Sequence, residues 1–158
     1  MAVSLEAVGS ELRCVDKSGT VYWTVSVDDL ILVAEYTTNE GPFVDDYYLI
    51  FCSIGAERAV FATCTFYAEG RDATLRSLSD RLGSPLELVL CGSTAWASRV
   101  LWPSSMVGEP YFSFEIAEPR HVLNRLQRFV FGPTTERFLS DPVQRYIREK
   151  LKSHASSA

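Results

Sequence analysis

Acidic side chains gather in one connection between two apolar stretches. Residues 37–46 read Thr-Thr-Asn-Glu-Gly-Pro-Phe-Val-Asp-Asp, and the span 18–57 contains no basic residue. Carboxylate and carbonyl oxygens are the ligands that Mg²⁺ and Ca²⁺ prefer. The connection is also longer than a usual hairpin loop of about 2–5 residues, and binding residues concentrate in such loops. Asp45 and Asp46 are therefore candidate binding residues, together with Glu35.

Two chemistries fit these carboxylates, and both have a plainer alternative. A pair such as Asp45 and Glu35 could exchange protons with a substrate, with or without a divalent ion. The loop spacing, however, differs from that of an EF-hand, whose acidic residues alternate before a glycine. Solvated loop carboxylates are the preferred interpretation, so we predict no metal site and no cofactor. A small carboxylate-dependent enzyme, with a divalent metal at the 37–46 loop, stays the alternative function.

Two tryptophans flank an arginine in the apolar stretch Ala95–Trp102. Strand alternation places Trp96 and Trp102 on one face and Arg99 on the other. Tryptophan and arginine are enriched at binding hot spots, and a buried arginine needs a carboxylate or an anionic ligand. Trp96, Arg99 and Trp102 are therefore candidate ligand- or partner-binding residues, with Glu35 as one intramolecular partner for Arg99. The competing interpretation assigns both tryptophans to the core, because each buries a large apolar area.

Nucleophilic and metal chemistry has few candidate residues in this chain. The histidines and cysteines are His121, His154, Cys14, Cys52, Cys64 and Cys91. The cysteines are widely spaced without a CxxC pair and lie among strand-like residues, so we expect free, buried thiols rather than a zinc site. The sequence also lacks the glycine-rich phosphate-binding motifs and the G-x-S-x-G elbow. No catalytic residue is predicted.

The net charge of −5 is the difference between an acidic first part and a basic tail. Residues 1–119 carry seven basic and seventeen acidic side chains, a net of −10, and residues 120–158 carry eight and three, a net of +5. The tail's arginines are spread along helix faces, no recognition motif accompanies them, and the whole chain is acidic. We therefore predict no nucleic-acid partner. We expect the tail to dock through its apolar stripes, with an anion-binding surface as the weaker alternative.

The first two thirds of the chain have the residue patterns of β-strands. Two of the stretches flank a short turn at 17–19 and predict a hairpin. The stretch 46–53 is apolar on both faces, which is typical of a central strand. The first five stretches are joined by short links and favour an antiparallel meander. The predicted strands are Glu11–Asp16, Thr20–Val27, Leu30–Tyr36, Asp46–Ser53, Arg58–Tyr67, Leu86–Cys91, Ala95–Trp102 and Tyr111–Ala117.

Three segments have helical spacing. The first is Asp72–Leu82, with Asp72 as its capping residue and Gly83 in a left-handed conformation after its end. The second follows Pro119, and its apolar positions are Val122, Leu123, Leu126, Phe129 and Val130. The third begins at Asp141, whose side chain would cap it ahead of Pro142 and Gln144. Residues 153–158 are expected to be a frayed end.

Strands followed by helices indicate an α+β fold in one domain spanning 1–158. Its sheet-rich portion is 11–117, with the inserted helix near 72–82, and its C-terminal helices occupy 119–152. About seven or eight strands form either an antiparallel sheet or a strongly curved, barrel-like one. In element order the chain is similar to the pleckstrin-homology (PH) family, and this resemblance implies a barrel capped by a C-terminal helix. The inserted helix and the second C-terminal helix depart from that pattern.

A non-catalytic binding or protein-interaction domain is the function these observations favour. The expected partner is another protein or a second copy of the chain, with a small-molecule ligand as a further alternative. No stretch approaches the ~20 apolar residues needed to cross a bilayer. The first residues, Met1–Glu6, lack the basic start and apolar core of a secretory signal. Together with the unpaired cysteines, this predicts a cytoplasmic location.

Overall fold

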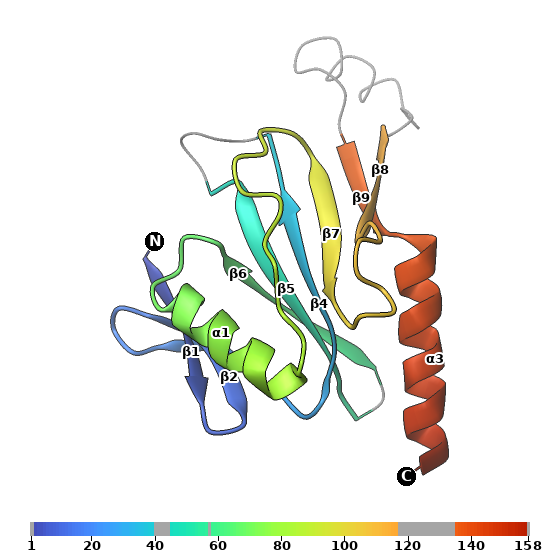
Figure 1. Cartoon of the computed structure of the whole chain (residues 1–158), viewed down its shortest axis with the longest axis horizontal. Helices are drawn as coiled ribbons and strands as arrows, with labels where there is room; N and C mark the ends of the chain where they lie inside the picture. The colour runs from blue at the N-terminus through green and yellow to red at the C-terminus, as the bar shows by residue number, and fades with distance from the viewer. Residues whose placement is uncertain (1, 40–44, 57, 117–134, 158) are drawn as a thin grey trace, which may run out of the picture.

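Nine strands and two helices make up the described part of the chain (Figure 1). The structure is a computed structural model that describes residues 2–39, 45–56, 58–116 and 135–157. The elements are β1 (Val3–Val8), β2 (Glu11–Asp16), β3 (Val21–Ser26), β4 (Leu30–Thr37), β5 (Tyr47–Ile54), β6 (Ala59–Thr65), α1 (Arg71–Leu82), β7 (Ala97–Trp102), β8 (Phe112–Ile116), β9 (Thr135–Leu139) and α3 (Asp141–Ser157).

The strands form two main sheets and a separate hairpin. Sheet A has the order β1-β2-β3, and sheet B has the order β6-β5-β4-β7. All neighbouring strands in both sheets are antiparallel. Within the described residues, the remaining two strands, β8 and β9, pair only with each other. The α+β class and the antiparallel pairing are therefore confirmed.

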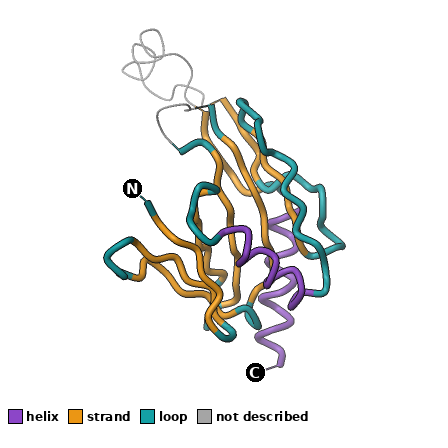
Figure 2. The backbone as a smooth tube through the Cα atoms, turned by 60° about the vertical axis from the view of Figure 1, so that its left-hand side comes forward, coloured by secondary structure: helices purple, strands orange, loops and turns teal. Residues whose placement is uncertain are grey.

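Sheet B separates two apolar cores. The inter-sheet core lies between sheet B and the layer of sheet A and α1, and it contains Leu5, Val33, Phe51 and Leu78. The second core lies on the opposite face of sheet B, where the α3 residues Val143 and Ile147 are buried. Figure 2 shows the two helices on opposite sides of this sheet. Because both faces are covered, β4 is buried along its whole length and β5 along most of it.

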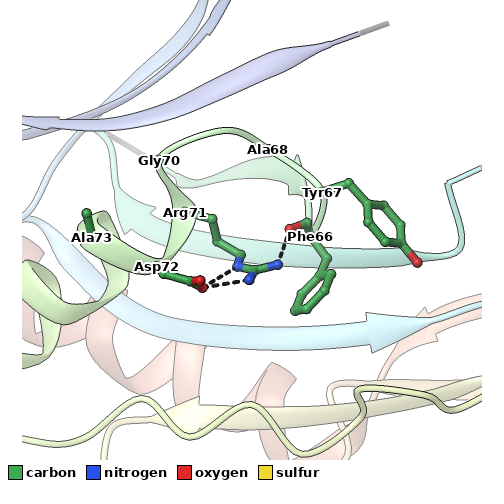
Figure 3. A pocket seen from close by; sticks show the side chains of 7 residues that line it. All are labelled: Phe66, Tyr67, Ala68, Gly70, Arg71, Asp72 and Ala73. Carbon is green, nitrogen blue, oxygen red and sulfur yellow. Dashed lines mark hydrogen bonds and ion pairs between the residues drawn. The ribbon is translucent and has the colours of Figure 1, made fainter.

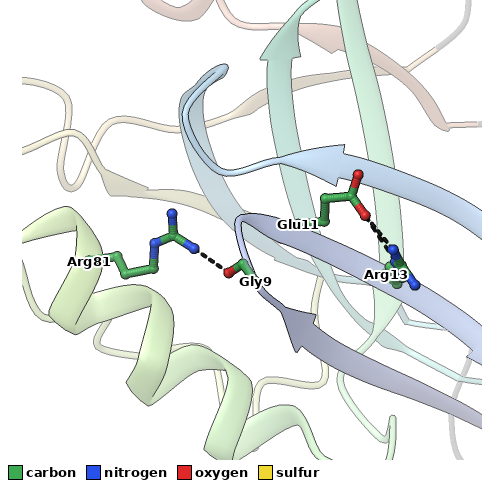
Figure 4. Close-up of polar contacts among 4 residues, drawn as sticks. All are labelled: Gly9, Glu11, Arg13 and Arg81. Carbon is green, nitrogen blue, oxygen red and sulfur yellow. Dashed lines mark hydrogen bonds and ion pairs between the residues drawn. The ribbon is translucent and has the colours of Figure 1, made fainter.

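Helix α1 is held against sheet A at its beginning and at its end. Near its start, Thr74 donates a hydrogen bond of 2.8 Å to the carbonyl of Leu5 in β1. Near its end, the Arg81 guanidinium donates to the carbonyl of Gly9 in the β1–β2 turn, whereas Arg13 pairs with Glu11 within β2 (Figure 4). The contacts of Thr74 and Arg81 keep the buried side of α1 over the inter-sheet core.

The residues before the two helices differ from the predicted caps. Gly70, with φ of 74°, precedes α1, so the prediction of Asp72 as the capping residue was wrong. Helix α3 begins at Asp141, and the hydroxyl of Ser140 accepts a bond of 3.4 Å from the amide of Val143. Ser140, rather than Asp141, is therefore the cap. The prediction of Gly83 in a left-handed conformation after α1 is confirmed by its φ of 64°.

The expectation of a closed or strongly curved barrel was wrong for the described residues. The predicted five-strand meander divides between two sheets, because the chain passes from β3 in sheet A directly into β4 in sheet B. The predicted strand Leu86–Cys91 is also absent, since this segment crosses the face of sheet B without pairing as a strand. The barrel implied by the PH resemblance therefore does not form.

Several boundaries at the chain ends also differ from the predictions. Strands β1 and β9 were not predicted, because each needs a partner to become a strand: β2 for β1 and β8 for β9. Residues 153–157 continue α3 rather than fraying. The predicted helix after Pro119 lies outside the described residues. On α3 the cationic side chains face solvent, as expected for a docked tail: Arg145, Arg148, Lys150 and Lys152.

The two glycines that flank α1 give a test of this packing. Both have positive φ, but a Cβ on Gly70 would lie 2.9 Å from the carbonyl oxygen of Leu5, whereas one on Gly83 would meet nothing within 4 Å. We expect Gly83→Ala to cost about 1 kcal/mol of unfolding free energy from backbone strain alone. Gly70→Ala should cost at least about 2 kcal/mol, because the clash adds to the same strain. Urea unfolding measures both, and equal losses would contradict the close approach of α1 to β1.

Candidate functional site

A buried carboxylate lies at the centre of the candidate site. Glu35 in β4 is fully buried on the face of sheet B that carries the inter-sheet core. One of its oxygens accepts a hydrogen bond of 3.0 Å from the amide of Val89. The other accepts a short bond from the hydroxyl of Tyr47 and a longer one, 3.4 Å, from the amide of Leu90. Backbone amides and a phenol thus replace the water that a carboxylate loses on burial.

The bond to Glu35 explains why the segment after α1 did not become a strand. Residues 84–90 cross over sheet B, and the amides of Val89 and Leu90 point to the carboxylate instead of to a neighbouring strand. The apolar side chains that predicted a strand here serve packing instead, since Leu86 and Leu88 contact the inter-sheet core. An apolar run of this length does not reveal whether its amides bind a strand or a side chain.

Tyr47 is the central residue of a stack that reaches the start of α1. Its ring lies parallel to that of Phe66, with centroids 4.1 Å apart, and the guanidinium of Arg71 lies 3.7 Å above the Phe66 ring. Arg71 also pairs with Asp72 and donates to the carbonyl of Phe66 (Figure 3). Burial and the bond to Glu35 raise the pKa of Tyr47 well above its usual value. The phenol therefore stays protonated and remains a donor to Glu35.

A pocket of about 290 Å³ lies beside this stack and is lined by residues 66–68 and 70–73 (Figure 3). Its charged groups, Arg71 and Asp72, are already paired with each other. Tyr67 on its rim is exposed and donates a bond of 2.8 Å to the carboxylate of Asp46, which raises the pKa of this tyrosine. The pocket therefore has an exposed aromatic ring on its rim, and the charges of its arginine and its aspartate neutralise each other.

Arg99 lies directly opposite Glu35 in the register of β4 and β7. The two residues are cross-strand neighbours, but they form no ion pair in the described structure, where Glu35 binds the phenol and the two amides instead. The Nε atom of Arg99 is buried and has no hydrogen-bond partner among the described residues. Binding of an anionic ligand by Arg99 stays a prediction.

The predicted alternation of side chains does not continue as far as Trp102. Trp102 pairs with Val33 and Val100 pairs with Ala34, so Leu101 between them is an extra residue in β7. Such a bulge reverses the alternation. Trp102 consequently packs against the inter-sheet core, whereas Val100 belongs to the core under α3. Trp96 precedes β7, which begins at Ala97, and is half-buried.

The two aspartates of the acidic loop lie at the base of the β4–β5 hairpin. The carbonyl of Asp46 accepts a bond of 2.7 Å from the amide of Thr38, and its carboxylate accepts from Tyr67. The carbonyl of Asp45 accepts a bond of 2.6 Å from Tyr48. Residues 40–44 of this loop lie outside the described structure. Within the ranges that are described, no three His, Cys, Asp or Glu side chains are grouped to hold a metal ion.

Strand β6 carries surface features that the candidate residues did not include. It is the last strand of sheet B on the side away from β7. Val60 and Phe61 are 41% and 46% exposed, although both are large and apolar. The sequence contained one signal of this surface, namely the absence of any charged residue from Ala59–Thr65. Sequence alone could not show that β6 would be an edge strand. No helix in the described ranges combines the length and the apolar character that a membrane span requires.

The buried bond between Tyr47 and Glu35 predicts a dependence of stability on alkaline pH. The folded chain holds the Tyr47 proton more tightly than the unfolded chain does, so its contribution to stability is complete below pH ~10 and is lost as the pH rises further. Tyr47→Phe should cost about 2 kcal/mol near pH 7, because a hydrogen bond to a charged group is removed. It should also make the fall in unfolding free energy above pH ~10 less steep. Denaturant unfolding from pH 7 to 11 measures both effects, and identical slopes for variant and wild type would contradict the assignment.

Comparison with known proteins adds no relative to this geometry. No protein family, no curated protein and no solved structure matches the chain.

Proposed function

We propose that this chain is a non-catalytic protein-interaction domain that associates with a second copy of itself through strand β6. The observation that carries the proposal is the exposure of Val60 and Phe61 on an uncharged edge strand. Edge strands of monomeric proteins usually carry charged residues or proline that discourage pairing, and Ala59–Thr65 has neither.

The backbone of β6 supports pairing at its outer edge. The carbonyl of Thr63 accepts a bond of 2.9 Å from the indole of Trp23 in β3, which occupies one acceptor of the strand. Because backbone groups alternate along a strand, those of Phe61 and Ala59 point in the same direction as those of Thr63. An added strand would find its main-chain partners along Ala59–Phe61.

A second copy fits this edge for reasons of charge and symmetry. Two β6 strands running antiparallel about a two-fold axis bring the same uncharged surface together on both sides, so no like charges meet. The pairing would join two copies of sheet B into one continuous sheet and cover Phe61 of each chain. A strand from a different protein could use the same edge, and the association state of the purified chain distinguishes the two cases.

The carboxylate-dependent enzyme receives less support from the described residues. Both oxygens of Glu35 are bound by protein donors, and the residue is fully buried, so a substrate in solvent does not reach it. Asp46 is engaged by Tyr67 at the base of the hairpin. A proton-transfer pair needs one free carboxylate within hydrogen-bond distance of its substrate.

Replacing Phe61 with lysine tests the proposal. We expect wild-type protein at high concentration to show a mass near twice 17.7 kDa by light scattering after size exclusion, and Phe61→Lys to remain at the mass of one chain. A lysine on an edge strand blocks pairing by placing two buried like charges together. Val8→Lys is the matched control, because Val8 is 45% exposed at the end of β1, on sheet A rather than on β6.

The control should retain self-association, and both variants should keep the melting temperature that the wild type shows at concentrations low enough for it to be a single chain, because association itself stabilises the folded state. A wild-type chain that stays at the mass of one chain at every concentration would overturn the proposal of self-association. Equal loss of association in both lysine variants would show that the contact does not involve β6.

A further inference from the structure

Two free thiols from different sheets are in contact inside the molecule. The Sγ atoms of Cys14 in β2 and Cys64 in β6 are 3.8 Å apart, and both residues are free and buried. They belong to the inter-sheet core, where sheet A lies over sheet B. The third buried cysteine, Cys52, belongs to the other core, under α3. Free, buried thiols are thus confirmed for three of the cysteines, whereas Cys91 is exposed.

We propose that Cys14 and Cys64 are an oxidisable pair whose disulfide fixes sheet A to sheet B. The oxidant class is a hydroperoxide. One thiol loses its proton, and the thiolate attacks the peroxide oxygen and becomes a sulfenic acid as the O–O bond breaks. The leaving oxygen takes up the released proton and departs as water or an alcohol. The second thiol then attacks that sulfur, the S–O bond breaks, and water leaves with the thiol proton. Two thiols are thereby oxidised by two electrons, and one peroxide is reduced.

The two sulfur atoms lie close enough to form a disulfide. A disulfide has an S–S length near 2.05 Å, so the sulfur atoms need to approach by about 1.8 Å. Cys14 pairs with Leu5 and Trp23 in sheet A, and Cys64 pairs with Leu49 in sheet B. The bond would therefore join the middle strand of one sheet to an edge strand of the other.

Burial sets the rate of this reaction. It raises the pKa of both thiols, so little thiolate forms while the two sheets are closed. Reaction accordingly requires a transient separation of sheet A from sheet B that admits the peroxide. Once formed, the disulfide opposes that same separation. The pair would respond to sustained oxidation and convert it into a more stable fold.

The test uses the whole 158-residue chain carrying Cys91→Ser, which removes the exposed thiol. After prolonged treatment with hydrogen peroxide, we expect loss of two hydrogen atoms, a Cys14–Cys64 cross-link in peptide mapping, and a free Cys52. The melting temperature should rise by about 10 °C, because the bond closes a long loop, and it should return to its starting value with dithiothreitol.

Two further chains serve as controls in the same background. Adding Cys52→Ala should leave the cross-link and the rise in melting temperature unchanged, and adding Cys14→Ala should abolish both. If Cys14→Ala does not fold, peptide mapping of the Cys91→Ser chain decides alone. The inference would be overturned by three remaining thiols, by sulfinic acid on Cys14 or Cys64 without a cross-link, or by a disulfide that includes Cys52.

Discussion

The buried carboxylate of Glu35 constrains much of this structure. A charged group in the interior of a sheet is costly unless donors surround it, so the chain must bring donors to the middle of β4. Tyr47 comes from the neighbouring strand, and the amides of Val89 and Leu90 come from the segment that follows α1. That requirement draws the segment across sheet B and so determines the path from α1 to β7.

The same requirement links Glu35 to the start of α1. The hydroxyl of Tyr47 binds the carboxylate, and Phe66 supports the ring of Tyr47 by stacking on it just after the end of β6. Arg71 then covers Phe66 at the first residue of the helix. The stack therefore connects the buried charge to the position where α1 begins, and Gly70 permits the sharp change of direction before it.

Local patterns predicted the elements whose side chains decide their structure, and failed where a distant group decides it. The continuous apolar run at 46–53 predicted a central strand, and β5 is one. Leu86–Cys91 is also apolar except at Glu87. The amides of Val89 and Leu90, however, are bound by a carboxylate that lies more than fifty residues away along the chain.

In the candidate site, too, contacts between distant parts of the chain decide what local patterns do not reveal. The sequence placed Glu35 among the possible partners of Arg99, but their cross-strand position depends on the register between β4 and β7, which no local pattern reveals. The bulge at Leu101 reversed the face of Trp102, and Tyr47 could not be identified because its role depends on the pairing of β4 with β5.

Strand β6 shows how one element can carry two independent properties. Its even-numbered residues Ala62 and Cys64 face the inter-sheet core, whereas Phe61 lies on the opposite face and its backbone is directed to the open edge. A disulfide at Cys64 would tighten the contact with sheet A without adding charge or bulk to the outer edge. Self-association through Phe61 would in turn leave the contact between Cys14 and Cys64 unchanged. The alternation of a single strand thus separates the stability of the two-sheet core from the surface through which the chain meets its partner.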